Sequence, residues 1–143
     1  KLSGENNPFA ERQKSCFKAA EICGKDFLRS VTLEDLEKCK SKMDQETYNR
    51  ALHGVEEDKR TLEAAEVLIK GDFNRFGELM NASHDSLRDL YEVSCPEVDE
   101  LVEIDRKTKR VYGSRITGGG FGGCTVTLID RDAVESLKDA VNV

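Results

Sequence analysis

Tryptophan is absent from this 143-residue sequence, and aromatic residues make up only 6% of it. We therefore expect a core built from Leu, Val, Ile, Ala and Phe side chains. No apolar run approaches the roughly 20 residues that span a membrane, so no membrane partner is expected. Basic residues are outnumbered, with 22 Lys and Arg against 28 Asp and Glu and a net charge of −6. This balance argues against a nucleic-acid partner.

Metal-binding and disulfide frameworks also lack their usual sequence patterns. The five cysteines are scattered without a CxxC pair, and there are only two histidines. Such a set predicts no metal site and favours reduced thiols in a cytoplasmic protein. The sequence begins with Lys1 rather than Met, and no secretory hydrophobic segment follows it. We therefore expect a fragment of a larger protein.

Helical periodicity dominates the first 107 residues. Asn7 followed by Pro8 predicts a helix start, and Gly24 predicts its end. Thr32 and Asp72 are predicted to cap later helices. The predicted helices cover about residues 8–23, 33–43, 44–70, 73–90 and 96–107. The last of these is preceded by Ser94-Cys95-Pro96-Glu97, which has the pattern of a capping box between Ser94 and Glu97.

Strand patterns begin only after these helices. Residues 111–116 are β-compatible, residues 124–129 alternate as a strand does, and residues 132–141 predict a final helix. Many helices followed by a strand pair predict an α+β fold, with helices packed on one face of a small antiparallel sheet. We expect a flexible segment over residues 1–8 and one domain over residues 9–143.

Five of the 11 glycines lie between the two predicted strands, within Gly118-Gly119-Gly120-Phe121-Gly122-Gly123. Glycine loses the most conformational entropy on folding, so the cluster needs a reason. One reason is a tight hairpin with several positive φ angles. The other is a backbone that must approach a phosphate or another loop closely. Because a turn alone needs one or two glycines, the functional reason is favoured.

Two familiar nucleotide motifs do not explain the cluster. Gly118, Gly120 and Gly123 satisfy G-x-G-x-x-G, but that fingerprint requires a helix directly after the glycines. Here the β-favouring residues 125–129 follow instead. A Walker A loop is excluded because Cys124 and Thr125, not lysine, come after Gly123.

The segment from Arg115 to Val126 closely resembles the third sequence motif of galactokinases, a family of GHMP sugar kinases. Upstream, Ser83-His84 and the Tyr-Glu-Val-Ser-Cys-Pro-Glu stretch at residues 91–97 are similar to the pattern that precedes that motif. The resemblance covers roughly residues 9–141. N-acetylgalactosamine kinases look similar but tend to carry Ala and Trp within this loop, so Phe121 favours the galactokinases.

This resemblance implies the C-terminal, ferredoxin-like domain of a GHMP kinase, without the N-terminal catalytic domain. It implies transfer of the ATP γ-phosphate to the anomeric hydroxyl of galactose, with Mg²⁺ and with an N-terminal half that completes the site. The family's catalytic aspartate, sugar contacts and main phosphate loop have no counterpart here, so no catalytic residue and no metal ligand is assigned to this chain. By itself the chain is expected to be inactive.

The resemblance places Thr117 and the loop residues 118–123 near the ATP phosphates, as one wall of the cleft. The residues of this predicted site are Thr117, Gly118, Gly119, Gly120, Phe121, Gly122 and Gly123. Phe121 is expected to be the packing anchor of the loop. Arg115 is either a phosphate contact or a structural arginine on a strand.

Other polar residues near the motif have structural explanations. His84 falls on an apolar helix face and is expected to be a hydrogen-bonded core residue. Arg88 and Asp89 are expected to form a polar cluster at a helix end, and Cys124 is expected in the core. Two alternatives to a galactokinase stay open: another GHMP sugar kinase, such as an N-acetylgalactosamine kinase, or a non-catalytic binding module with a kinase-like fold.

Overall fold

The computed structural model describes residues 7–141 and contains six α-helices and two β-strands within them. The helices are α1 (Pro8–Ile22), α2 (Leu33–Cys39), α3 (Gln45–Ile69), α4 (Phe73–Asp89), α5 (Pro96–Lys107) and α6 (Val134–Ala140), and the strands are β1 (Val111–Thr117) and β2 (Cys124–Ile129). Short 3₁₀ turns cover Leu28–Ser30, Lys40–Lys42 and Arg131–Ala133. The predicted flexible segment over residues 1–8 lies mostly outside the described residues, and α1 begins at Pro8.

Local capping explains where several helices begin. The Asn7 side chain accepts a hydrogen bond from the Ala10 amide at 2.8 Å, directly before Pro8. At α2, Thr32 and Asp35 exchange hydrogen bonds between side chain and backbone, a capping box with Asp in place of Glu. Asp72 caps α4 through the Arg75 amide at 3.0 Å. These satisfied amides confirm the predicted helix starts.

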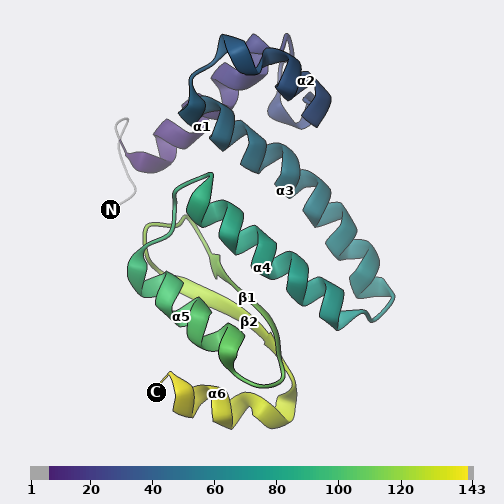
Figure 1. Cartoon of the computed structure of the whole chain (residues 1–143), viewed down its shortest axis with the longest axis vertical. Coiled ribbons are helices and arrows are strands. Elements are labelled where there is room, and N and C mark those ends of the chain that lie inside the picture. Colours follow the sequence, from purple (N-terminus) through teal and green to yellow (C-terminus); the bar gives the residue numbers. More distant parts are fainter. Residues whose placement is uncertain (1–6, 142–143) are drawn as a thin grey trace. The chain divides into compact units, whose positions relative to one another are not determined.

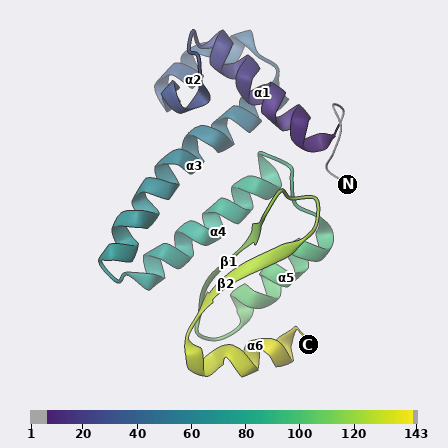
Figure 2. The same ribbon diagram turned by 180° about the vertical axis from the view of Figure 1, so that it is seen from behind.

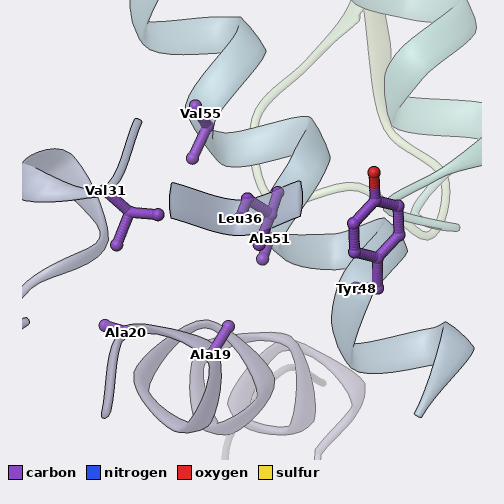
Figure 3. Close-up of a cluster of buried hydrophobic side chains, with 7 residues drawn as sticks. All are labelled: Ala19, Ala20, Val31, Leu36, Tyr48, Ala51 and Val55. Atoms are coloured by element: carbon purple, nitrogen blue, oxygen red, sulfur yellow. The ribbon is translucent and has the colours of Figure 1, made fainter. Parts of the chain in front are cut away.

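The chain divides into two compact units within α3, between Lys59 and Arg60. The first unit, residues 1–59, has a small core where α1, α2 and the first part of α3 meet. Figure 3 shows this cluster: Ala19, Ala20, Val31, Leu36, Tyr48, Ala51 and Val55. Because alanines occupy the α1 side, the helices can approach closely, and Leu36 fills the centre at 1% exposure.

The second unit, residues 60–143, holds the sheet. β1 and β2 pair antiparallel, with Ser114 opposite Thr127 and Thr117 opposite Cys124. Helices α4 and α5 lie on the same side of this hairpin, and Figure 2 shows the strands in front with both helices behind. This arrangement confirms the predicted α+β fold, with helices on one face of a small antiparallel sheet.

The apolar period of α3 predicts its helical structure but not the burial of its second half. Tyr48 and Val55 are buried in the first unit, whereas Leu62 is 70% exposed and Ile69 is 88% exposed. The sequence pattern is interrupted near Asp58, next to the boundary between the units. Among residues 7–141, no helix is both long and apolar enough to cross a membrane.

Candidate functional site

The glycine-rich segment forms the connection between β1 and β2. Backbone φ angles are +85° at Gly118, +80° at Gly120, +113° at Gly122 and +102° at Gly123. Side chains with a Cβ rarely adopt these values, so the glycines are required by the path of the backbone. A strand and not a helix follows Gly123, which excludes a dinucleotide-binding turn. The predicted hairpin with several positive φ angles is confirmed.

Three of these glycines leave bare backbone at the surface of the loop. A Cβ atom placed on Gly118, Gly122 or Gly123 would meet no other atom within 4 Å. No neighbouring atom of the described residues therefore prevents a Cβ at these three positions, and only the strain of the positive φ angles disfavours one. A stretch of backbone with so few side chains can be approached closely by an anion, to which its amide groups can donate hydrogen bonds.

Gly120 has a different environment because it rests against the segment that joins α4 and α5. A Cβ on Gly120 would lie 2.6 Å from both the Cβ and the carbonyl oxygen of Val93. Next to it, the Phe121 amide donates a 2.6 Å hydrogen bond to that same carbonyl. Phe121 itself has φ +59° and is 37% exposed. One contact that holds the loop is thus made by backbone atoms, and the anchoring role of the Phe121 ring stays a prediction.

Thr117 and Arg115 lie at the β1 end of the loop. Thr117 is exposed and pairs with Cys124 at the base of the hairpin. Arg115 donates from Nε to the Ile116 carbonyl at 3.0 Å, in agreement with a structural arginine on a strand. Contact of Arg115, or of exposed Gly119, with a phosphate stays a prediction.

Helix α4 covers the outer edge of β1 with side-chain acceptors. Asn81 Oδ1 accepts from the Ser114 amide at 3.0 Å, and His84 Nδ1 accepts from the Ile116 amide at 3.2 Å. These contacts take the place of a neighbouring strand and satisfy two edge donors. His84 is fully buried, and burial together with the nearby Arg106 guanidinium lowers its pKa. The prediction that His84 is a hydrogen-bonded core residue is confirmed.

The close approach of α4 to β1 depends on two glycines that sequence analysis did not single out. A Cβ on Gly77 would lie 2.0 Å from the Tyr112 carbonyl oxygen, and one on Gly113 would lie 2.2 Å from the Gly77 carbonyl oxygen. No side chain fits in either place. The helix can therefore reach the strand edge only with glycine at both positions.

A buried carboxylate links α5 to both strands. Asp105 Oδ2 accepts from Ser114 Oγ at 2.5 Å and from Thr127 Oγ1 at 2.6 Å. Asp105 is 4% exposed and Ser114 is fully buried. Sequence analysis missed this group, although a signal exists: Asp105 continues the apolar helical spacing of Val98 and Val102.

Two further predictions near the loop were wrong. Cys124 is exposed and not in the core, because it starts β2 on the face away from the helices. Ser94 is not the cap of α5; the helix starts at Pro96, so the capping position falls on Cys95. The Ser94 hydroxyl instead donates to Asp99 Oδ1 at 2.5 Å. Arg88 does pair with Asp89 at the end of α4, through contacts of 2.7 and 2.9 Å.

No group of three or more His, Cys, Asp or Glu side chains that could hold a metal ion occurs within residues 7–141. The loop thus presents backbone amide groups at its glycines, and the hydrogen bonds described above support it. It contains no acidic residue that could act as a general base. Binding of an anionic group at this loop stays a prediction.

Known proteins are similar to this chain in sequence and in fold. A family model described as GHMP kinases C terminal matches residues 64–142. The galactokinase of Bos taurus is 53% identical over 130 residues, which is 91% of this chain and 33% of that protein. The galactokinase of Actinobacillus succinogenes is 41% identical over 144 residues, covering 98% of this chain and 37% of that protein.

Among solved structures, Lactococcus lactis galactokinase complexed with galactose matches with a TM-score of 0.90 at 34% identity. The match covers 99% of this chain and 38% of that one. The chain thus spans about a third of the length of the curated relatives it matches.

Proposed function

The chain belongs to the GHMP kinase family, whose C-terminal domain it matches, and we therefore propose that it is the C-terminal portion of a galactokinase. The whole enzyme transfers the γ-phosphate of ATP to the anomeric hydroxyl of galactose and releases galactose 1-phosphate. The observation that carries the proposal is the glycine-rich loop with its positive φ angles. This loop occurs in a chain that is 53% identical to a galactokinase over 130 residues.

In this proposal the loop residues 118–123 form one wall of the active-site cleft. ATP supplies the phosphoryl group. The backbone at Gly118, Gly122 and Gly123 would then approach a phosphate, and the open space around these glycines, where an added Cβ meets no atom within 4 Å, supports this role. Phosphoryl transfer depends mostly on positioning and on stabilisation of charge, and fixed amide donors contribute to both. Thr117 and Arg115 flank this wall and are proposed neighbours of the phosphates.

The remaining machinery is assigned to the N-terminal half of the enzyme. This assignment rests on the family resemblance, which implies that the ligands of Mg²⁺ and the catalytic base belong to the N-terminal half. The contribution of this chain is then to orient the nucleotide and to exclude water on one side of the cleft. We also propose a cytoplasmic location, which is favoured by the five scattered cysteines without a CxxC pair.

Substrate choice provides the test. The purified full-length protein that contains this chain is assayed with ATP and Mg²⁺ on galactose and on N-acetylgalactosamine, with ADP release as the readout. We expect the ratio kcat/KM to favour galactose by about a hundredfold or more, because a site shaped for one sugar rejects a bulkier derivative. Preference for N-acetylgalactosamine would assign the chain to the related kinases, and turnover of neither sugar would contradict the proposal.

A further inference from the structure

Two backbone amides hold the glycine-rich loop, one in β1 just before it and one within it. At the β1 end, the Ile116 amide donates to His84 Nδ1 at 3.2 Å, two residues before Gly118. Beyond Gly120, the Phe121 amide donates to the Val93 carbonyl at 2.6 Å. Ile116 and Val93 are 2% and 4% exposed, so water does not readily replace either contact.

A path of side chains joins these two contacts. His84 Nε2 lies 3.2 Å from Asp99 Oδ1, although the two groups are not aligned for a full hydrogen bond. Asp99 Oδ1 also accepts from Ser94 Oγ at 2.5 Å. Ser94 directly follows Val93, whose carbonyl holds Phe121. The imidazole of His84 therefore touches one loop contact directly and reaches the other through two side chains.

We propose that His84, on the buried face of α4, is a positioning residue for the glycine-rich loop and sets the position of its β1 end and of its middle at Phe121. Its consequence for catalysis rests on the proposed kinase function. The residue does not touch the loop glycines or any reacting atom in this proposal. It acts through Ile116 on one side, and through Asp99 and Ser94 on the other.

The chemistry of imidazole suits this double role. Because Nδ1 accepts from the Ile116 amide, the proton of the neutral ring lies on Nε2, which faces the Asp99 carboxylate. No other uncharged side chain of this size offers an acceptor and a donor on opposite sides of a rigid ring. Asparagine can reproduce the Nδ1 acceptor and glutamine the Nε2 donor, but neither reproduces both.

These two substitutions form a matched pair for the test. Hydrogen exchange and steady-state kinetics are measured on the full-length protein, wild type and with His84→Asn or His84→Gln. We expect His84→Gln to speed exchange of the Ile116 amide about tenfold, through loss of one buried hydrogen bond. We expect His84→Asn to keep Ile116 protected but to speed exchange of the Phe121 amide.

The kinetic readout separates positioning from folding. Both variants should lower kcat by about tenfold to a hundredfold, as misplacement of a catalytic wall by about 1 Å does, with the KM for galactose unchanged. His53→Asn is the control, because His53 is a buried histidine of the first unit at 6% exposure. It should leave exchange of residues 116–121 as in the wild type.

Two results would overturn the proposal. One is wild-type exchange at both Ile116 and Phe121 in the two His84 variants. The other is a uniform rise in exchange over all of residues 60–141, which is the behaviour of an ordinary core residue. If the His84 variants do not fold, Asp99→Asn keeps the imidazole and should speed exchange at Phe121 alone. If the wild type lacks kinase activity, the proposed function fails, while the exchange data still decide the role of His84.

Discussion

Gly120 and Gly122 differ in their surroundings, although both have positive φ angles. We predict that Gly122→Ala lowers kcat of the full-length kinase about tenfold or more while costing only about 1–2 kcal/mol of stability, the strain of a left-handed residue. Gly120→Ala should cost more stability, because its Cβ would lie 2.6 Å from Val93. Urea unfolding and kinetics on both variants measure the two effects.

Gly24→Ala is the matched control for this comparison. Gly24 has φ +67°, and its added Cβ would meet nothing within 4 Å, so the strain is similar to that at Gly122. It lies in the first unit, in a turn that belongs to no proposed site. Gly24→Ala should lose similar stability and keep normal kinetics. Normal turnover in Gly122→Ala as well would leave the loop with a turn role only.

The buried ring of His84 also predicts how stability depends on pH. The pKa of His84 is lowered, first by burial and then by Arg106 on α5. Asp99, also on α5, acts in the opposite direction and raises it. From α4, the helix of His84 itself, Asp85 raises and Arg88 lowers this pKa, and β1 faces the ring with the Ile116 amide. Because the unfolded chain binds the proton more readily, stability is full above about pH 6.5 and falls as the pH drops below it.

Urea unfolding of the chain between pH 8 and pH 5 measures this dependence. The wild type should lose stability progressively below about pH 6.5, and His84→Asn should show a smaller loss over the same window. Carboxylates contribute mainly at lower pH, so they add little in this range. Identical pH curves for the two proteins would contradict a neutral buried His84.

At the scale of whole elements, the crossing of α4 over β1 depends on Gly77. Gly77→Ala would place a Cβ 2.0 Å from the Tyr112 carbonyl oxygen, and this backbone group cannot move aside without shifting the strand. We predict a loss of about 3 kcal/mol, near the upper end of overpacking costs, despite the better helix propensity of alanine. Thermal unfolding of the variant measures the change.

Gly54→Ala is the matched substitution inside another helix. Its Cβ would lie 2.6 Å from Leu28 Cδ2, the far end of a flexible side chain that can rotate away. The gain in helix propensity, about 1 kcal/mol, should offset most of that crowding, so stability should change little. Equal losses at Gly54 and Gly77 would show that the α4–β1 contact is not especially close.

The elements themselves could be predicted from the sequence because their signals are local. Caps such as Asn7 and Thr32, and the alternation after Gly123, depend only on nearby residues. Burial could not be predicted as well, since it depends on partners distant in the sequence. Leu62 and Cys124 have the expected periodicity and are nevertheless exposed.

At the scale of the site, sequence analysis found the loop but not its supports. The glycines stand out because positive φ angles require them over a short stretch of sequence. Asn81 and Asp105 do not stand out, because single polar residues on helices are usually solvated. Their role arises only when α4 and α5 pack on β1. The side-chain oxygen of Asn81, for example, accepts from the amide of Ser114, which is more than 20 residues away in the sequence.

For the molecule as a whole, we predict that the 143-residue chain alone does not phosphorylate galactose. The family resemblance assigns the catalytic carboxylate, the sugar contacts and the main phosphate loop to sequence that this chain lacks. One wall cannot hold a hydroxyl and a γ-phosphate in line or shield them from water. A coupled ADP-release assay with millimolar galactose, ATP and Mg²⁺ should show no turnover above background, with the full-length protein as positive control. Turnover of roughly 1–1000 per second, ordinary for an enzyme, would place the chemistry within these residues.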